Sequence, residues 1–258
     1  MKKLLCCLLI VFASCSKEAA KKINTTGPGT QNTTPSETNG TLSFSGYTWK
    51  IKDSGAGTAG PGPNRWKSAN AFVDANGHLH LKLSKNTITG VWECAEVTSQ
   101  QSFGYGTYQW KVEGAINNFD KYIVLGLFNY SGIDGYDEMD IEYAKWGVET
   151  NPWANYTVYP KQGDGPANFH NATTFTTEST YTTNRFKRTA SSVIFKTLNG
   201  FYDDDTNLAY TTTCASPANS ISTLSMPVHM NIWLFQGHAP ASNSTVEIII
   251  HEFKFTPL

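Results

Sequence analysis

Apolar and polar residues alternate with a period of two along most of the chain from Thr41 onward, in short runs. This spacing places apolar side chains on one face of a β-strand and polar side chains on the other. The clearest run is His78 to Leu83, which has a leucine at every second position. Similar runs cover 106–112, 123–128, 138–143, 156–159, 192–196, 228–234 and 246–255. No amphipathic helix of more than a few turns accompanies them.

Gly, Asn, Asp and Pro separate these runs, as expected for turns between many short strands. The pattern predicts an all-β fold, an antiparallel β-sandwich of two sheets. We expect one sheet to be concave and to form a groove. A sandwich of this class commonly folds as a single unit at this length, so we predict one folded domain at 42–258.

The N-terminus has the pattern of an export signal. Lys2 and Lys3 precede a short apolar run at 4–12, and small residues follow it. The stretch Phe12-Ala13-Ser14-Cys15 resembles the lipobox of bacterial lipoproteins, although Phe12 departs from the usual Leu, Val or Ile. We therefore predict a signal peptide at 1–14 and lipidation at Cys15. The alternative is an ordinary signal peptide that leaves Cys15 free.

A lipid at Cys15 implies a bacterial cell envelope protein, anchored to the membrane only through that lipid. The outer membrane is the expected location, and Ser16-Lys17-Glu18 resembles the polar tag of some surface-displayed lipoproteins. Residues 15–41 are rich in Lys, Thr, Asn, Pro, Ser and Gly, a composition that cannot bury enough apolar surface to fold. We predict a flexible tether there.

The composition of the chain limits the kinds of molecule that it can bind. The formal net charge is -1 and only 16% of residues are charged, so no basic surface is available for nucleic acid. Aromatic residues make up 13% of the chain, which fits either core packing or flat platforms for sugar rings. Export permits a disulfide between Cys94 and Cys214, and two buried free thiols are the alternative. We expect a monomer.

The segment Asp137-Glu138-Met139-Asp140-Ile141-Glu142-Tyr143 is the strongest functional signal in the chain. In a strand, Glu138, Asp140 and Glu142 share one face, above apolar residues on the other. The Cα atoms of Glu138 and Glu142 would then be about 13 Å apart, a gap that two glutamate side chains can narrow when they lean together. A retaining glycosidase needs its two carboxyl groups about 5 to 5.5 Å apart. The segment therefore predicts a catalytic carboxylate pair, with a solvated face or a calcium site as alternatives.

The same segment resembles the signature of glycoside hydrolase family 16, in the regular-strand form of bacterial lichenases, the β-1,3-1,4-glucanases. Other segments match in the same order, so that the resemblance covers about residues 45 to 256. They are Trp92-Glu93-Cys94-Ala95-Glu96, the run from Phe103 to Tyr108, Leu127 to Gly132 and Met230-Asn231-Ile232-Trp233. The resemblance implies a concanavalin A-like jelly roll whose concave sheet forms the substrate groove.

The resemblance also assigns roles. It makes Glu138 the nucleophile, Glu142 the general acid and base, and Asp140 the carboxylate that orients and tunes Glu138. The expected substrate-binding residues are Glu96, Tyr136, Trp146, Trp153, Asn155, Asn231, Trp233 and Trp92. For Trp146 and Trp153, packing of the loop that follows the acid strand is the alternative. Thr98 and Arg188 depart from the family pattern, which carries an Arg and a Trp at these places.

These observations predict a retaining, endo-acting glycoside hydrolase that cleaves a β-linked polysaccharide, a β-glucan. The alternatives are a non-catalytic carbohydrate-binding surface lipoprotein and a transglycosylase on the same fold. No cofactor is expected, and no histidine has metal-ligand spacing with Cys or with another His. A structural calcium stays open, although we interpret the run from Asp203 to Asn207 as a solvated turn.

Overall fold

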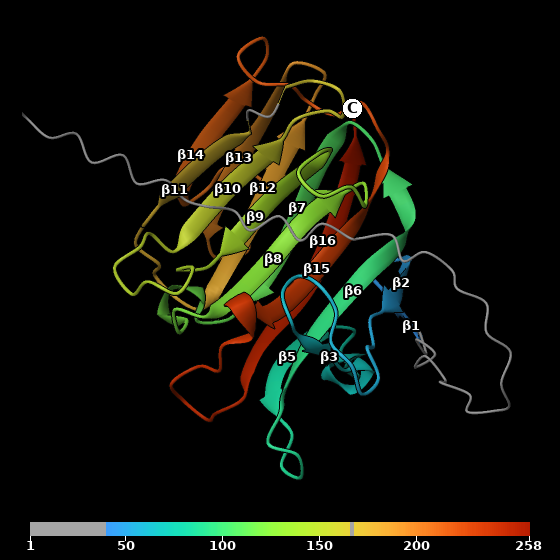
Figure 1. The fold of residues 1–258 in the computed structure, drawn as a ribbon. Helices are drawn as coiled ribbons and strands as arrows, with labels where there is room; N and C mark the ends of the chain where they lie inside the picture. The colour runs from blue at the N-terminus through green and yellow to red at the C-terminus, as the bar shows by residue number, and fades with distance from the viewer. Residues whose placement is uncertain (1–39, 166–167) are drawn as a thin grey trace, which may run out of the picture. The chain divides into compact units, whose positions relative to one another are not determined.

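The computed structural model describes residues 40–165 and 168–258, and within them the chain forms sixteen strands and three single-turn 3-10 helices (Figure 1). The predicted signal peptide at 1–14, the lipidation site Cys15 and nearly all of the tether at 15–41 lie outside the described residues. They stay predictions. Within the described part, no helix has the length and apolar character needed to cross a membrane.

The strands form two layers. The layer that we call the front sheet has the hydrogen-bonding order β11 (Phe169–Thr173), β10 (Ala154–Tyr159), β9 (Glu138–Tyr143), β8 (Ile123–Tyr130), β15 (Met226–Leu234), β6 (Trp92–Phe103), β2 (Tyr47–Ile51) and β1 (Thr41–Phe44). The back sheet has the order β4 (Ala71–Val73), β5 (Leu79–Lys85), β16 (Val246–Pro257), β7 (Gly106–Glu113), β12 (Tyr181–Arg188), β13 (Ser192–Asn199) and β14 (Leu208–Ala215). The pairing of β5 with β6 joins the two sheets at one end.

Three single-turn 3-10 helices lie in the connections: η1 (Ser68–Asn70), η2 (Ile116–Asn118) and η3 (Phe235–Gly237). Every strand pairing in the described part is antiparallel, except that of the two-residue strand β3 (Arg65–Trp66) with β6. The prediction of an all-β antiparallel sandwich of the jelly-roll type, with a curved sheet, is confirmed (Figure 1).

The core lies between the two sheets, and the inner face of the acid-bearing strand β9 packs against it. Met139, Ile141 and Tyr143 are fully buried on its inner face. The Tyr143 hydroxyl bonds to Asn184 on β12 and lies 3.2 Å from Thr197 Oγ1 on β13, across the sandwich. These buried polar groups are therefore paired, as a stable core requires. Side chains from both sheets thus fix the position and tilt of β9.

All eight runs predicted as strands are strands in the structure, whereas the other eight strands, among them the long strands β6 and β12, escaped prediction. The first six residues of β6 are buried on both faces, so this half of the strand shows no alternation. In β12 the inward-facing side chains include Thr182, Asn184 and Arg188, which are polar and buried. A pattern that identifies inward positions by their apolar character misses such a strand.

Cys94 on β6 and Cys214 on β14 are free thiols, and both are buried. The structure therefore has two buried free thiols and no disulfide between Cys94 and Cys214. Burial raises the pKa of Cys94 to about 12 and that of Cys214 to about 11, so neither forms a thiolate at neutral pH. Both cysteines act as small apolar residues of the core.

Candidate active site

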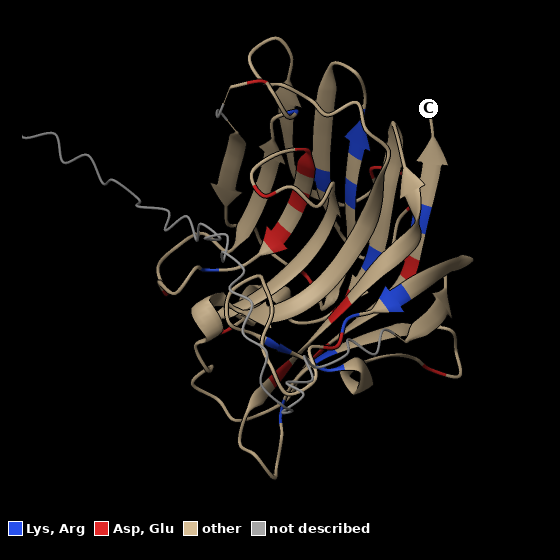
Figure 2. Cartoon of the chain, turned by 45° about the vertical axis from the view of Figure 1, so that its right-hand side comes forward, with Lys and Arg blue, Asp and Glu red and all other residues tan. Residues whose placement is uncertain are grey.

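Strand β9 presents Glu138, Asp140 and Glu142 on one face, opposite its buried apolar residues. We call this the front face of the front sheet. The acidic residues of β9 are the red bands along one strand in Figure 2. Asp140 is buried, whereas Glu138 and Glu142 are half-buried and keep solvent-exposed surface. Solvent therefore reaches both ends of the trio but not its centre.

Strand register identifies the neighbours of each acid. Directly paired residues of adjacent strands point to the same face. On β10 and β8 respectively, Tyr159 and Tyr130 flank Glu138, Thr157 and Phe128 flank Asp140, and Asn155 and Gly126 flank Glu142. Burial is the largest cause of the raised pKa of both tyrosines; the charges of the three acids add to it for Tyr159, and Asp134 followed by Glu138 and Asp140 add to it for Tyr130. The acids thus lie in a row walled by aromatic rings at one end.

The three carboxyl groups have pKa values above their ordinary range. Burial is the main cause, and it raises the pKa of Glu138 to about 7 and, together with the charge of Glu138, the pKa of Glu142 to about 8. The pKa of Asp140 is raised well above its usual value by burial and by the charges of both glutamates. A hydrogen bond from Asp140 favours the charged form of Glu138.

This arrangement separates two chemical roles on one strand. Glu138 is the member of the trio whose negative charge is supported by a hydrogen bond, from the side chain of Asp140. Glu142 has the higher pKa of the two glutamates and holds a proton at neutral pH. A carboxylate and a carboxylic acid placed together supply a nucleophile and a proton donor. No group of three or more His, Cys, Asp or Glu side chains in the described part is placed to hold a metal ion.

The row that contains Glu142 continues across the sheet. Gly126 on β8 pairs with Asn231 on β15, and Asn231 pairs with Glu96 on β6. A Cβ atom added to Gly126 would lie 2.6 Å from Asn231 Oδ1, so only glycine leaves room for this amide. The structure therefore brings the predicted residues Glu96, Asn231 and Glu142 into one transverse row.

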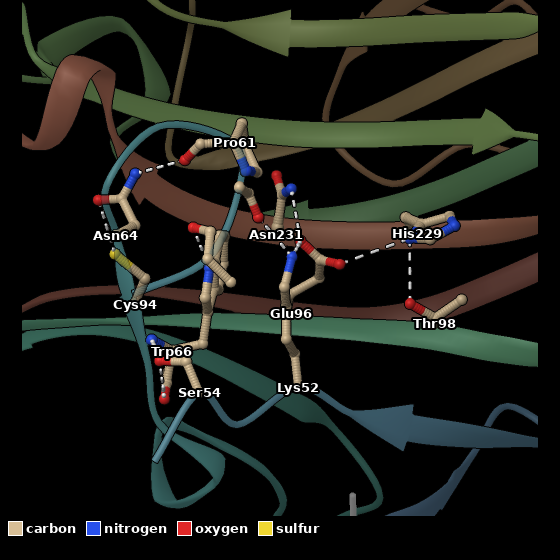
Figure 3. Close-up of polar contacts among 12 residues, drawn as sticks. Lys52, Ser54, Pro61, Asn64, Trp66, Cys94, Glu96, Thr98, His229 and Asn231 are labelled. Atoms are coloured by element: carbon tan, nitrogen blue, oxygen red, sulfur yellow. Dashed lines mark hydrogen bonds and ion pairs between the residues drawn. The ribbon is translucent and has the colours of Figure 1, made fainter. Parts of the chain in front are cut away.

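Glu96 is 6% exposed, and its carboxylate is bound by other side chains (Figure 3). Lys52 Nζ lies 3.1 Å from Glu96 Oε2, and Asn231 Nδ2 donates to the same oxygen at 3.2 Å. His229 Nδ1 lies 3.6 Å from Glu96 Oε1. Although burial opposes ionisation, the nearby His229 ring, the charge of Lys52 and the hydrogen bond from Asn231 hold the pKa of Glu96 below its usual value.

Aromatic residues gather near the Glu142 end of β9. Trp146 Nε1 donates a hydrogen bond of 3.1 Å to Asn155 Oδ1, and Asn155 Nδ2 donates to the Ala144 carbonyl at 3.0 Å. The ring centroid of Trp146 lies 6.4 Å from that of Trp233 and 5.5 Å from that of Phe235. The predicted residues Trp146, Asn155 and Trp233 therefore form one cluster beside the general-acid candidate.

Three other predicted residues lie elsewhere. Trp153 packs against Tyr143, on the core side of the sheet, and against Phe175, which corresponds to the loop-packing alternative for this residue. Trp92 begins β6, four residues before Glu96, and is almost fully buried. Tyr136 lies in the loop before β9, where its carbonyl accepts a hydrogen bond from Ser131. Within the described residues no hydrogen bond joins the side chain of any of these three to the acids, and a substrate-binding role for them stays a prediction.

Sequence reasoning missed several residues of this region, among them Lys52, His229 and Tyr159. His229 and Tyr159 occupy alternate positions on strands β15 and β10, in phase with Asn231 and Asn155. The period-two rule applied to those strands could have found them. Lys52 lies just after β2, and nothing in its local sequence indicates that it reaches Glu96.

Comparison with known proteins finds β-glucanases, the class of enzyme that the sequence motifs resemble. No protein-family model matches the chain. A β-glucanase of Bacillus amyloliquefaciens is 27% identical over 143 residues, which are 50% of this chain and 58% of that enzyme. A β-glucanase of Bacillus subtilis matches equally, over 57% of its length. The chain thus spans a little more than half the length of the curated relatives that it matches.

Solved structures extend the likeness over most of the folded part. The β-glucanase of Bacillus licheniformis superposes with a TM-score of 0.62 at 20% identity, over 86% of this chain and all of that one. A Mycobacterium tuberculosis antigen described as a pseudo β-1,3-glucanase superposes with a TM-score of 0.57 at 17% identity, over 79% of this chain and 88% of that one. The resemblance to bacterial lichenases is confirmed in sequence and in fold.

Proposed function

Because the chain resembles bacterial β-glucanases in sequence and in fold, we propose that it is a retaining, endo-acting glycoside hydrolase that cleaves a β-glucan. The observation that carries this proposal is the row Glu138, Asp140 and Glu142 on the front face. Two of these acids are accessible to solvent, and burial raises the pKa of all three, with the charge of Glu138 adding to the effect for Asp140 and Glu142. A purely structural role would offer no compensation for the mutual repulsion of three adjacent acids, one buried and two half-buried.

The reaction proceeds in two steps. Ionised Glu138 attacks the anomeric carbon while protonated Glu142 donates its proton to the departing glycosidic oxygen, which leaves a glycosyl group bound to Glu138. Glu142, now ionised, takes a proton from a water molecule that displaces Glu138 from the sugar. Two inversions at the same carbon retain its configuration. Asp140 holds a proton next to Glu138 and stabilises its charge between turnovers.

The position of β9 within the front sheet supports cleavage inside a polymer. Strands β10 and β11 lie on one side of β9, and β8, β15, β6, β2 and β1 lie on the other. A polysaccharide that crosses the front face can therefore contact the protein on both sides of the scissile bond. The cluster of Trp146 and Trp233 supplies aromatic surface for a sugar ring near Glu142.

A non-catalytic carbohydrate-binding protein is the second candidate. The relative described as a pseudo β-1,3-glucanase has this fold, so the fold alone does not secure activity. The acid row favours the enzyme, because binding a neutral sugar requires no pair of raised-pKa glutamates. A transglycosylase would use the same acids and would differ only in transferring the sugar to another hydroxyl group in place of water.

Barley β-glucan, laminarin, xyloglucan and agarose form a panel that tests the proposal. We expect release of new reducing ends from barley β-glucan or laminarin, with a rapid fall in polymer length because cleavage is internal. Proton NMR of the first products should show the β-anomer before mutarotation. Binding to these polymers without release of reducing ends from any of them would establish the carbohydrate-binding alternative.

The pH dependence should follow the raised pKa values. Glu138 must be ionised, so activity is lost as pH falls through its pKa of about 7. Glu142 must be protonated, so activity is lost as pH rises through its pKa of about 8. We therefore expect a bell-shaped profile of kcat/KM with its maximum between these values, whose limbs belong to the coupled pair. An optimum near the ordinary glutamate pKa of about 4.3 would contradict this prediction.

A further inference from the structure

The hydroxyl group of Tyr130 has one proton to donate and more than one carboxylate near it. Tyr130 on β8 is directly paired with Glu138 on β9, so the two side chains leave the front face side by side. The Tyr130 hydroxyl donates its hydrogen bond to Asp134 Oδ1, at 2.6 Å. Burial, and after it Asp134, raises the pKa of Tyr130, so this hydroxyl keeps its proton at neutral pH. The one proton that Tyr130 can donate is therefore taken by Asp134.

The loop that carries Asp134 is fixed at both ends by the backbone. Ser131 N donates to the Asp137 carbonyl at 3.1 Å, which closes the loop just before β9 begins. Asp137 N donates to the Pro160 carbonyl at 2.8 Å, which ties the same point to the end of β10. Asp134 itself is exposed. Its carboxylate is thus held beside the Glu138 end of the acid row while its outer surface stays in solvent.

We propose that Asp134 and Tyr130 are positioning residues for the nucleophile, in which Asp134 takes the Tyr130 proton so that Tyr130 gives no hydrogen bond to Glu138. Ionised Glu138 then has Asp140 as its side-chain donor and stays more reactive than a carboxylate that accepts from both neighbours. The inference rests on the proposed function. It adds a device outside the acid row that sets the pH at which the nucleophile becomes ionised.

The chemistry of the phenol makes the choice of partner exclusive. A tyrosine hydroxyl donates a single hydrogen bond. A hydrogen bond to an ionised carboxylate favours the charged form, which lowers the pKa of the carboxyl group. Burial is the main cause of the raised pKa of Glu138, and the charge of Asp134 adds to it. Asp134 therefore opposes ionisation of Glu138 in two ways, through its own charge and by occupying the Tyr130 proton.

The other ionisable groups around Glu138 carry no positive charge. They are Asp140 and Glu142 on its own strand, Tyr130 on β8, Tyr159 on β10 and Asp134 in the preceding loop. Burial and neighbouring acids raise the pKa of both tyrosines, so both are neutral at neutral pH. Because Asp134 is exposed, its charge is the one among the acids that dissolved salt screens most.

Asp134→Ala and Asp134→Asn form a matched pair for the test. Asparagine keeps an oxygen that accepts from Tyr130 and removes only the charge, whereas alanine removes both and frees the Tyr130 proton for Glu138. The readout is the apparent pKa of Glu138, followed by the NMR shift of its carboxyl carbon in protein isotope-labelled at glutamate. The signal is identified by its absence in Glu138→Gln. Both Asp134 variants must first show the circular dichroism spectrum of the wild type.

We expect Asp134→Ala to lower the apparent pKa of Glu138 by about one unit, the effect of one hydrogen bond to a carboxylate. Asp134→Asn should lower it by less, and this smaller shift should shrink in about 0.5 M NaCl, which screens an exposed charge. Glu247→Gln, which removes an acid from the back sheet, should leave the pKa of Glu138 unchanged. An unchanged pKa in Asp134→Ala would overturn the proposal.

Tyr130→Phe shows whether the Tyr130 proton carries the effect. In the Asp134→Ala background this change removes the freed donor, so the pKa of Glu138 should rise again toward the wild-type value. In the wild-type background it should change the pKa little, because the proton is already bound to Asp134. Equal effects of Tyr130→Phe in both backgrounds would refute the exchange of partners. Loss of stability or of kcat without any movement of the pKa would reduce Asp134 to a loop-holding residue and would also refute it.

Activity on barley β-glucan separates this inference from the proposed function. In Asp134→Ala the acidic limb of the kcat/KM profile should move to lower pH by the amount that NMR gives for Glu138. Movement of the NMR pKa in a protein that cleaves no glycan would refute the enzymatic proposal alone. Glycan cleavage with an acidic limb and an NMR pKa that do not move would refute the role of Asp134 and Tyr130 alone.

Discussion

Glu138→Ala is expected to lower kcat by at least about 10⁴-fold on any glucan that the wild type cleaves, because the variant has no group to form the covalent intermediate. The protein should stay folded. The side chain of Glu138 is half-buried on the front face, and the core contacts of β9 come from Met139 and Ile141 on the other face. Removing one of three mutually repelling acids also relieves charge in the row.

Azide makes this prediction specific to the nucleophile. The space left by the missing carboxyl group can admit this small anion, which attacks the anomeric carbon from the side where Glu138 lies. Protonated Glu142 still protonates the leaving oxygen. With azide present, we expect Glu138→Ala to recover part of its activity on an oligomeric β-glucoside that carries an activated aryl leaving group. The product should be an α-glycosyl azide, since only one inversion takes place. A β-azide, or rescue without any azide product, would show that Glu138 is not the nucleophile.

The matched control is Glu247→Ala, on β16 of the back sheet. Glu247 lies outside the front face and contacts His80 and Lys82. Its loss should leave kcat unchanged. A large loss in this variant would mean that removing any glutamate disturbs the fold, and the Glu138 result would then carry no mechanistic meaning.

Glu142→Gln should lower kcat/KM on a natural glucan by about 10²- to 10⁴-fold, the usual contribution of a general acid. Glutamine has the same shape but cannot donate a proton to the glycosidic oxygen. The loss should therefore depend on the leaving group. A substrate with a dinitrophenyl leaving group needs no protonation, so its glycosylation step should be nearly as fast as in the wild type, and hydrolysis of the intermediate should become rate-limiting.

The pH profile supplies a second readout for Glu142. Because Glu142→Gln removes the general acid of the coupled pair, the variant should lose the alkaline limb of the wild-type profile and keep an acidic limb. Glu247→Gln serves as the isosteric control and should keep both limbs. Equal losses on the activated and the natural substrate, with both limbs retained, would contradict the assignment of Glu142 as the acid.

The sequence was sufficient for the parts of the molecule that obey a local rule. Alternation identified eight of the strands, including β9 with its three acids on one face, because side-chain direction in a strand depends only on position along it. The order of motifs around 138–143 also indicated the lichenase-like fold. Strand β6 escaped because residues 92–97 are buried on both faces, and such a segment has no period to detect.

Only the tertiary structure decided which distant residues meet and in which environment. Trp146 and Trp153 occupy the same loop region, yet one joins the cluster near Glu142 and the other packs behind the sheet against Tyr143. The contact of Lys52 with Glu96 joins residues 44 positions apart, and Asn231, which bonds to the same carboxylate, is 135 positions from Glu96. The raised pKa values of the acids likewise depend on burial by neighbouring strands. Local sequence fixes the direction of a side chain along its own strand, whereas solvent exclusion and charge pairing are properties of the whole packed sandwich.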